Sequence, residues 1–190
     1  MIFSRKNNDA PGRAEVGALY DKHAPWLLAV CMRYTGNRED AEDVLHDGFM
    51  KVIRSVKDFK DQPTGCLEAW MRRIIVNTAL NYLRDHKKER MFTGLEEGHQ
   101  YLEDDVQVDE GGWDLSKEQL MNLLCGMPAG YRTVFNMYVM ENYSHKEIAG
   151  MLGISENTSK TQLLKARNYL KKRLLENKGI KTYENAESNR

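Results

Sequence analysis

Apolar residues recur every three or four positions along the first half of the chain, which is the spacing that places one face of a helix in a core. The pattern predicts a first helix over Val16–Tyr34, with Pro25 in its path as a kink or a restart. A second helix is expected from Asn37 or Asp40 to about Val56, and a third from about Cys66 to His86.

The second half of the chain has the same helical spacing, and no segment alternates apolar and polar residues as a half-buried strand would. Helices are expected over Leu115–Gly126 and Tyr131–Glu141, followed by two short helices around Gly153. Residues 179–190 are expected to be a frayed tail. The predicted fold class is therefore all-α, with two small helical domains.

The segment from Ser144 to Ser155 contains signals for two helices joined by a tight turn. The Ser144 hydroxyl can accept a hydrogen bond from the backbone N–H of Glu147, whose carboxylate can reach back to the N–H of Ser144, and this capping box starts the first helix. Gly153 can adopt the left-handed conformation that the turn needs, and Ser155 can cap the second helix. This is the layout of a DNA-reading helix-turn-helix.

The helix that follows Ser155 divides into an apolar face and a basic face. Its core face is expected to carry Leu163, Ala166, Leu170 and Leu174, and its outward face Lys160, Thr161, Leu164, Lys165, Asn168 and Lys171. A helix fits the DNA major groove, where threonine and lysine can bond base edges and leucine can touch a thymine methyl group. The alternative is an ordinary antiparallel helix pair with a solvated basic face.

The formal charge is balanced, with 28 Lys and Arg against 28 Asp and Glu, but the acidic residues are unevenly distributed. Residues 91–114 have no Lys or Arg and contain Glu96, Glu97, Glu103, Asp104, Asp105, Asp109, Glu110 and Asp114. With four glycines as well, this segment is expected to be a linker. The predicted organisation is a flexible N-terminus (1–15), a first domain (16–90), the acidic linker (91–114), a second domain (115–178) and the tail (179–190). Basic blocks on both sides of the linker can attract a polyanion.

The third predicted helix has a polar face made of cations and amides. The residues at spacings of three or four are Arg73, Asn77, Asn81, Arg84 and Lys88. Asparagine can pair with an exposed base edge, and Trp70 together with the loop from Phe59 to Gly65 can enclose an unstacked base. The alternative is a solvated polar face on a core helix.

The three cysteines, Cys31, Cys66 and Cys125, are far apart and lack the spacing of zinc ligands. Neither a disulfide framework nor a zinc site is indicated, which favours a reducing, cytoplasmic location. The chain shows no signal-peptide core and no run that could span a bilayer.

Asp43 and His46 have the i, i+3 spacing found in carboxylate-bridged di-iron bundles. Such bundles need the motif from two helices and two further inward carboxylates, and the chain has no second pair of this kind. Two interpretations are favoured over a metal site: a surface acidic patch that docks on a basic partner, and a solvated helix start whose acidic residues are stabilised by the helix dipole. No metal and no cofactor are expected.

Three stretches, in the same order along the chain, resemble a bacterial RNA polymerase sigma factor of the extracytoplasmic-function (ECF) class of the sigma-70 family. They are Asp40–Ile53, Trp70–Arg84 and the helix-turn-helix at Ser144–Ser155. The resemblance covers Val16–Arg90 and Leu115–Lys178, which correspond to the second and fourth sigma regions of the family. The absence of a third sigma domain is also typical of this compact class.

The resemblance implies three sets of contact residues. Binding of core polymerase is implied for Asp40, Asp43, His46, Asp47 and Phe49. Contact with the minus-ten promoter element is implied for Arg72, Arg73, Asn77, Asn81 and Arg84, with the loop Lys60–Cys66 as the pocket for a flipped base. Contact with the minus-thirty-five element is implied for Thr158, Lys160, Thr161, Leu164, Lys165 and Arg167.

The resemblance also implies the partners. These are core RNA polymerase, promoter DNA and an anti-sigma protein, with no membrane insertion and no catalysis by the chain itself. The acidic linker corresponds to a segment that threads through the polymerase, where negative charge can mimic nucleic acid. The alternative function is a free-standing helix-turn-helix repressor, which would dimerise on palindromic sites, although the sequence has no heptad seam for a dimer.

Overall fold

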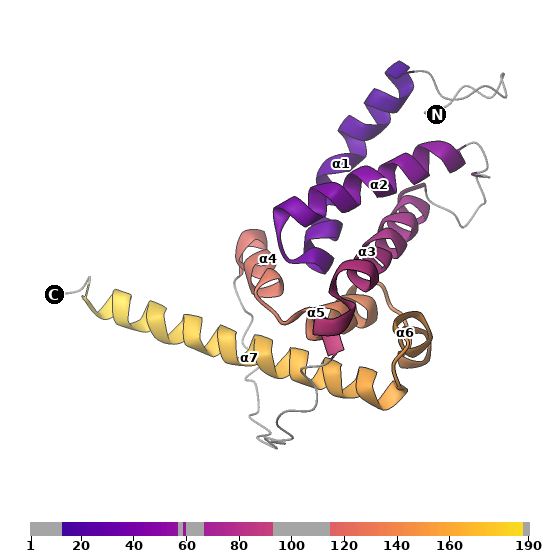
Figure 1. Ribbon diagram of the computed structural model, residues 1–190. Helices are drawn as coiled ribbons and strands as arrows, with labels where there is room; N and C mark the ends of the chain where they lie inside the picture. The colour runs from indigo at the N-terminus through magenta and orange to yellow at the C-terminus, as the bar shows by residue number, and fades with distance from the viewer. Residues whose placement is uncertain (1–12, 57–58, 60–66, 93–114, 188–190) are drawn as a thin grey trace. The chain divides into compact units, whose positions relative to one another are not determined.

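The computed structural model describes residues 13–56, 59, 67–92 and 115–187, and all regular structure in these ranges is helical (Figure 1). The chain separates into two compact units, Met1–Lys88 and Glu89–Arg190. The prediction of an all-α fold with two small helical domains is confirmed. No helix in the described ranges is long and apolar enough to cross a membrane.

The first unit contains three helices, α1 (Arg13–Thr35), α2 (Arg38–Ser55) and α3 (Leu67–Phe92). Pro25 lies inside α1, which continues through it, so the expected restart is absent. Leu19 and Leu27, on either side of the proline, are both buried, so core packing on both sides offsets the one hydrogen bond lost at Pro25.

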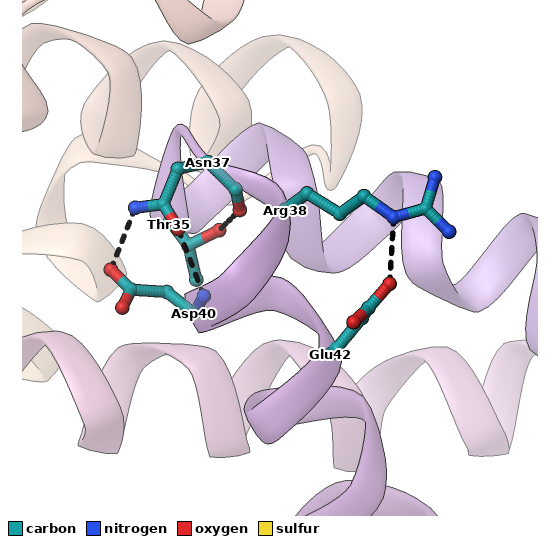
Figure 2. A network of polar contacts seen from close by, with 5 residues as sticks. All are labelled: Thr35, Asn37, Arg38, Asp40 and Glu42. Carbon is teal, nitrogen blue, oxygen red and sulfur yellow. Dashed lines mark hydrogen bonds and ion pairs between the residues drawn. The ribbon is translucent and has the colours of Figure 1, made fainter.

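The start of α2 is fixed by Asn37, which resolves the choice between Asn37 and Asp40. Its backbone is extended, at φ −147° and ψ 162°, and its side-chain oxygen accepts from the backbone N–H of Asp40 at 2.8 Å. The hydroxyl of Thr35 donates to the carbonyl oxygen of Asn37 at 2.9 Å, which ties the end of α1 to this cap (Figure 2). An N-cap bond of this kind is worth about 1 kcal/mol.

The helices α2 and α3 meet at Gly48. A Cβ atom at this position would lie 2.5 Å from Cδ1 of Ile75, which is itself fully buried. Only glycine therefore permits this close approach without displacing the isoleucine. The surrounding core includes Leu27, Cys31, Val52 and Met71, each with at most 3% exposure.

The second unit contains α4 (Lys117–Cys125), α5 (Ala129–Phe135), the π-helical turn η3 (Asn136–Met140), α6 (His145–Leu152) and α7 (Glu156–Glu187). Both α5 and α6 pack on α7, shown in orange to yellow in Figure 1. The core has Leu124, Met127 and Ala166 at its centre, surrounded by Tyr131, Phe135, Tyr169 and Leu170. The buried Arg132 side chain donates to the carbonyl oxygens of Cys125 and Met127, which fixes the turn between α4 and α5.

The element boundaries differ from the predictions in three places. The predicted helix over Tyr131–Glu141 is instead α5 continued by a π-helical turn, and α7 extends to Glu187 where a frayed tail was expected. The third helix runs to Phe92, two residues into the expected linker, whose residues 93–114 lie outside the described ranges. Lysine and glutamate are good helix formers, so one glycine at 179 does not end a long helix.

Candidate nucleic-acid and polymerase interfaces

The helix-turn-helix is built by the local bonds that its sequence predicts. The Ser144 hydroxyl accepts from the N–H of Glu147, and the Glu147 carboxylate accepts from the Ser144 N–H at 2.8 Å. These bonds from the Ser144 backbone and hydroxyl lower the pKa of Glu147, which therefore stays ionised at the positive end of the helix. Gly153 has φ 68° and ψ 34°, the left-handed conformation, and the Ser155 hydroxyl accepts from the N–H of Thr158 at 3.0 Å. All three predictions about this segment are confirmed.

The two faces of α7 separate by burial. Leu163 and Ala166 are buried, whereas Lys160, Thr161, Leu164, Arg167 and Asn168 are exposed, with Leu164 at 54%. Lys165 is half-buried, and the half-buried Thr158 has its hydroxyl 2.9 Å from that of Ser155. Cations, a hydroxyl and an exposed leucine thus lie together along the first three turns of α7, a set of groups that can contact phosphates, base edges and thymine methyl groups.

Arg173, further along α7, is already engaged. Its guanidinium lies 5.5 Å from the ring centre of Tyr169 and 3.2 Å from a carboxylate oxygen of Glu176. The Tyr169 hydroxyl in turn donates to the carbonyl oxygen of Gly126 at 2.7 Å. This part of α7 therefore attaches the helix to the turn after α4.

His145, the first residue of α6, is a part of this interface that the sequence did not indicate. Its ring stacks on Tyr138 at 4.6 Å, and its Nδ1 lies 2.9 Å from the hydroxyl of buried Ser159 on α7. Burial and then the charge of Lys160 lower the pKa of His145. The imidazole is therefore neutral near pH 7 and joins α6 to α7. No local signal could have identified a contact between residues 14 apart.

The polar face of α3 is exposed as the spacing predicts. Arg73, Asn77, Asn81 and Arg84 are all exposed, while Ile75, Ala79 and Leu83 on the other side are buried. The Arg84 guanidinium donates to Oδ1 of Asn81 at 2.9 Å and lies 3.6 Å from the Asp85 carboxylate. The cation thereby orients the amide beside it. The side chain of Lys88, the last residue of this predicted face, lies outside the described residues.

Arg72 is not brought to this face. Arg72 precedes Asn77 by five positions, so on a helix that turns 100° per residue the two side chains are about 140° apart around the helix axis. Its guanidinium stands 5.8 Å from the ring centre of Trp26 on α1. The Trp26 indole N–H donates to Nδ1 of His23 at 3.2 Å, and burial lowers the pKa of that histidine, which keeps the acceptor nitrogen unprotonated. Arg72 therefore packs against α1.

Trp70 lies at the N-terminal end of the exposed α3 face. Its ring centre is 5.1 Å from that of Phe59, and the two planes are tilted by 46°. Phe59 is held by a bond from its N–H to the carbonyl oxygen of Val56 at 3.2 Å. The two rings lie where the sequence places an enclosure for a base, while the loop Lys60–Cys66 that completes it falls outside the described ranges.

The outer face of α2 is acidic. Asp43, His46 and Asp47 are exposed, and beside them Arg38 pairs with Glu42 at 2.7 Å (Figure 2). A cationic partner can approach such a face without burying an uncompensated charge.

Two residues expected on this surface are placed differently. Phe49 is only 3% exposed and lies edge-on to Tyr20 at 4.9 Å, so its apolar ring belongs to the core. Asp40 is half-buried, and its carboxylate accepts from the Tyr82 hydroxyl of α3 at 2.7 Å. Among the described residues, no three His, Cys, Asp or Glu side chains are grouped closely enough to hold a metal ion.

Two family models match the chain. The one described as Sigma-70 region 2 covers residues 19–89, and the one described as Sigma-70, region 4 covers residues 117–170. The chain is 28% identical to ECF RNA polymerase sigma factor SigE of Mycolicibacterium smegmatis over 80% of its own length, and it spans only 59% of that relative. It is 29% identical to RNA polymerase sigma factor SigV of Bacillus subtilis over 76% of its length, and it spans 81% of that protein.

Solved structures with a similar chain include the sigma factor RpoE of Bartonella quintana in complex with the anti-sigma factor NepR. The TM-score is 0.47 at 22% identity, over 84% of this chain and 96% of that one. CnrH, in complex with the cytosolic domain of CnrY, gives a TM-score of 0.42 at 21% identity, over 86% of this chain and 89% of that one.

Proposed function

The chain belongs to the sigma-70 family and resembles its ECF class, and we propose that it binds core RNA polymerase and directs promoter-specific transcription initiation. The observation that carries the proposal is that regions 2 and 4 match in order along one chain, and that each match holds a helix with an exposed face of cations and amides or hydroxyls. One such face belongs to α3 and the other to α7.

We assign reading of the minus-thirty-five element to α7. Its N-terminal half would enter the major groove of duplex DNA, with Thr158, Lys160, Thr161, Leu164, Lys165 and Arg167 as the contact residues. Lysine and arginine would hold phosphates, while threonine and leucine would reach base edges and thymine methyl groups. Leu164, at 54% exposure, is accessible for a contact with a thymine methyl group.

We assign capture of the minus-ten element to the exposed face of α3. Asn77 and Asn81 would bond the edges of unstacked non-template bases, with Arg73 and Arg84 near the phosphates. Arg72, also expected in this set, would act from the side of α3 that faces Trp26, and so reach the backbone only at the edge of the interface. Base capture must offset an unstacking cost of a few kcal/mol.

We assign docking on core polymerase to the acidic face of α2, with Asp43, His46 and Asp47 as the contact residues. Phe49 would support this face from the core rather than touch the partner, since burial leaves it no accessible surface. The chain itself would have no catalytic role and would act in the cytoplasm. An anti-sigma protein is a further expected partner.

The test is run-off transcription by purified core RNA polymerase on a library of promoter fragments, with and without the full chain. Discrete new transcripts that share two spaced elements are the expected result. A chain that binds a palindrome by itself and neither binds core polymerase nor starts transcription would instead be the repressor considered above.

A charge reversal makes this test sharper. Asp47→Lys should weaken binding to core polymerase, because it removes an acidic contact and adds a like charge. Glu118→Lys on α4 serves as the matched control, since it makes the same charge reversal at an exposed carboxylate of the other unit, outside the proposed interfaces, and should leave core binding unchanged. Equal core binding by the Asp47 variant and wild type would refute the assignment of the α2 face.

A further inference from the structure

The carboxylate of Asp40 joins the start of α2 to the middle of α3. One oxygen accepts from the Tyr82 hydroxyl at 2.7 Å, and the other accepts from the side-chain amide of Asn37 at 2.8 Å. Figure 2 shows the Asn37 side of this arrangement, where Asn37 both caps the backbone N–H of Asp40 and donates to its carboxylate. Both oxygens are thus occupied inside the protein.

The bond from Tyr82 spans 42 residues and is charge-assisted. The Tyr82 ring also stacks on His86 at 4.2 Å, so the phenol is held from two sides. The hydrogen bond to Asp40 raises the pKa of Tyr82 to about 12, and the hydroxyl therefore remains a donor throughout the neutral range.

A second bond joins the same two helices further along. The Lys51 ammonium donates to the hydroxyl of Thr78 at 3.1 Å, and Thr78 donates to the carbonyl oxygen of Ile74. The close approach of Gly48 to Ile75 is a third point of contact between α2 and α3. A helix held at several points along its length cannot rotate about its own axis without breaking one of them.

Rotation of α3 matters because its polar face is narrow. Asn77, Asn81 and Arg84 fall within about 60° of one another on a helix that turns 100° per residue. Tyr82 directly follows Asn81 in the chain and lies about 100° further around the helix, on the side that faces α2. Any rotation of α3 about its axis that breaks the hydrogen bond from Tyr82 to Asp40 also changes the direction in which the Asn81 amide points.

We propose that Asp40 and Tyr82 are positioning residues that set the rotation of α3 relative to α2, an inference that rests on the proposed function. The polymerase-docking face of α2 and the base-reading face of α3 are then presented as one body. Asp40 acts inside the protein rather than as a contact for polymerase, although it lies on the same helix as Asp43 and Asp47. Binding of polymerase through α2 thereby delivers the α3 amides in a fixed direction.

The experiment uses holoenzyme assembled from the full chain and core RNA polymerase, with two readouts for each variant. One is the affinity for core polymerase, and the other is the affinity of the holoenzyme for single-stranded non-template DNA that carries the minus-ten element. The variants are Tyr82→Phe, which keeps the ring on His86 and removes only the hydroxyl, Asp40→Ala, and the double variant. Asp43→Ala is the matched control, because it removes an exposed carboxylate from the same helix without removing a bond to α3.

Tyr82→Phe should weaken DNA capture about threefold to tenfold, the effect of one hydrogen bond. Asp40→Ala, which also removes the bond from the Asn37 amide, should weaken it at least as much, and both variants should keep core affinity within about twofold of wild type. The double variant should lose no more than the worse single variant, because both changes remove the same bond. Asp43→Ala should show the opposite pattern, with weaker core binding and unchanged DNA capture by the assembled holoenzyme.

Three results would overturn the positioning role. The first is a loss of core affinity in Asp40→Ala like that in Asp43→Ala, with no change in either readout for Tyr82→Phe. That result would make Asp40 a polymerase contact. The second is additive loss in the double variant. The third is an equal fall in both readouts for Tyr82→Phe together with a lower melting temperature, which would show a role in stability alone. If the wild-type chain itself forms no holoenzyme, the proposed function fails and this inference falls with it.

Discussion

The two units position their candidate reading helices by different kinds of contact. In the second unit, α7 begins at bonds between residues three apart, such as Ser155 with Thr158, just after the left-handed Gly153. In the first unit, α3 is oriented by bonds from α2 that span 27 and 42 residues. The start of α7 is thus defined by bonds between neighbouring residues, and the orientation of α3 by bonds to α2.

This difference determines what each unit tolerates. A local cap is lost one bond at a time, at a cost of about 1 kcal/mol, and the rest of the helix remains. Contacts across a packed interface share one geometry, so a change at one point is transmitted to the others. His145 and Tyr169 are exceptions within the second unit, since the bond of His145 to Ser159 crosses from α6 to α7 and the bond of Tyr169 to Gly126 joins α7 to the turn after α4.

The largest expected effect concerns the proposed contacts of each unit with DNA. Asn77→Ala should lose about 1 to 3 kcal/mol for the preferred base and relax the preference at one minus-ten position, because an asparagine amide reads one base edge. Competition among single-base variants of a promoter, measured with holoenzyme, gives this value. A uniform loss across all bases would contradict base reading by Asn77.

Lys165→Ala in α7 should behave differently. If Lys165 holds a phosphate, its loss should weaken binding evenly across sequences and reduce the salt slope of DNA affinity by about one. A titration of affinity against salt concentration measures the slope. An unchanged slope would mean that the lysine holds no phosphate.

The next effect compares two glycines. Gly48→Ala should destabilise the first unit by about 1 to 2 kcal/mol, because its Cβ would lie 2.5 Å from Cδ1 of Ile75. Gly150→Ala, where a Cβ meets nothing within 4 Å, should instead stabilise the second unit by up to about 1 kcal/mol through helix propensity. Urea denaturation of the full chain, followed by circular dichroism and tryptophan fluorescence, measures both changes.

Ile75→Val supplies the control for the Gly48 variant, since it removes the Cδ1 atom that the new methyl group would meet. In the Gly48→Ala background it should recover part of the lost stability, whereas in the wild type it should cost about 0.5 to 1.5 kcal/mol. A Gly48→Ala variant as stable as wild type would show that α2 and α3 separate easily.

A smaller effect is expected from the local caps. Ser144→Ala should cost the second unit about 1 kcal/mol, and Ser116→Ala, which removes the equivalent capping box of α4, about the same. In a chain that carries Trp113→Phe, the tryptophan signal offers a check, since the remaining Trp26 and Trp70 both lie in the first unit. A cap variant that also shifted the unfolding of that unit would contradict a local role.

The smallest expected effect is a pH dependence of the second unit. Burial, followed by the charge of Lys160, lowers the folded-state pKa of His145 below its usual value near 6.5. The unfolded chain therefore binds the proton more readily, and the stability contribution present above about pH 6.5 is lost as pH falls through the lower folded-state pKa. His145→Gln should flatten this dependence, measured as melting temperature between about pH 7 and pH 5. An equally steep dependence in the variant would assign it to another group.

Several features of the fold and the interfaces could be predicted from the sequence. The Ser144 box, the Gly153 turn and the Ser155 cap were predicted and are confirmed, since each depends on residues within one helical turn. The capping box of Ser116 with Gln119 has the same signature and could also have been read from the sequence. The exposed face of α3 followed from spacing alone.

Other expectations differ from the structure where packing decides. Of the kink or restart expected at Pro25, the restart is absent, and α1 has buried residues on both sides of the proline. Phe49, which the resemblance placed among the polymerase contacts, lies against Tyr20, and Arg72, which the resemblance placed near the phosphates, lies over Trp26. An acidic helix start gave no sign that Asp40 would be bonded to Tyr82.

The sequence by itself determined the helices, the helix-turn-helix with its caps, the family, and the residues at helical spacing on each polar face. These features depend on the periodicity of a single helix and on hydrogen bonds within one turn. Both are set by nearby residues and do not depend on where the helix packs. Only the tertiary structure decided which carboxylate of α2 remains exposed, which arginine of α3 packs against α1, and how α3 is rotated on α2. Those outcomes depend on atoms brought together from distant parts of the chain, by a glycine that allows close approach and by hydrogen bonds formed only after the helices have packed.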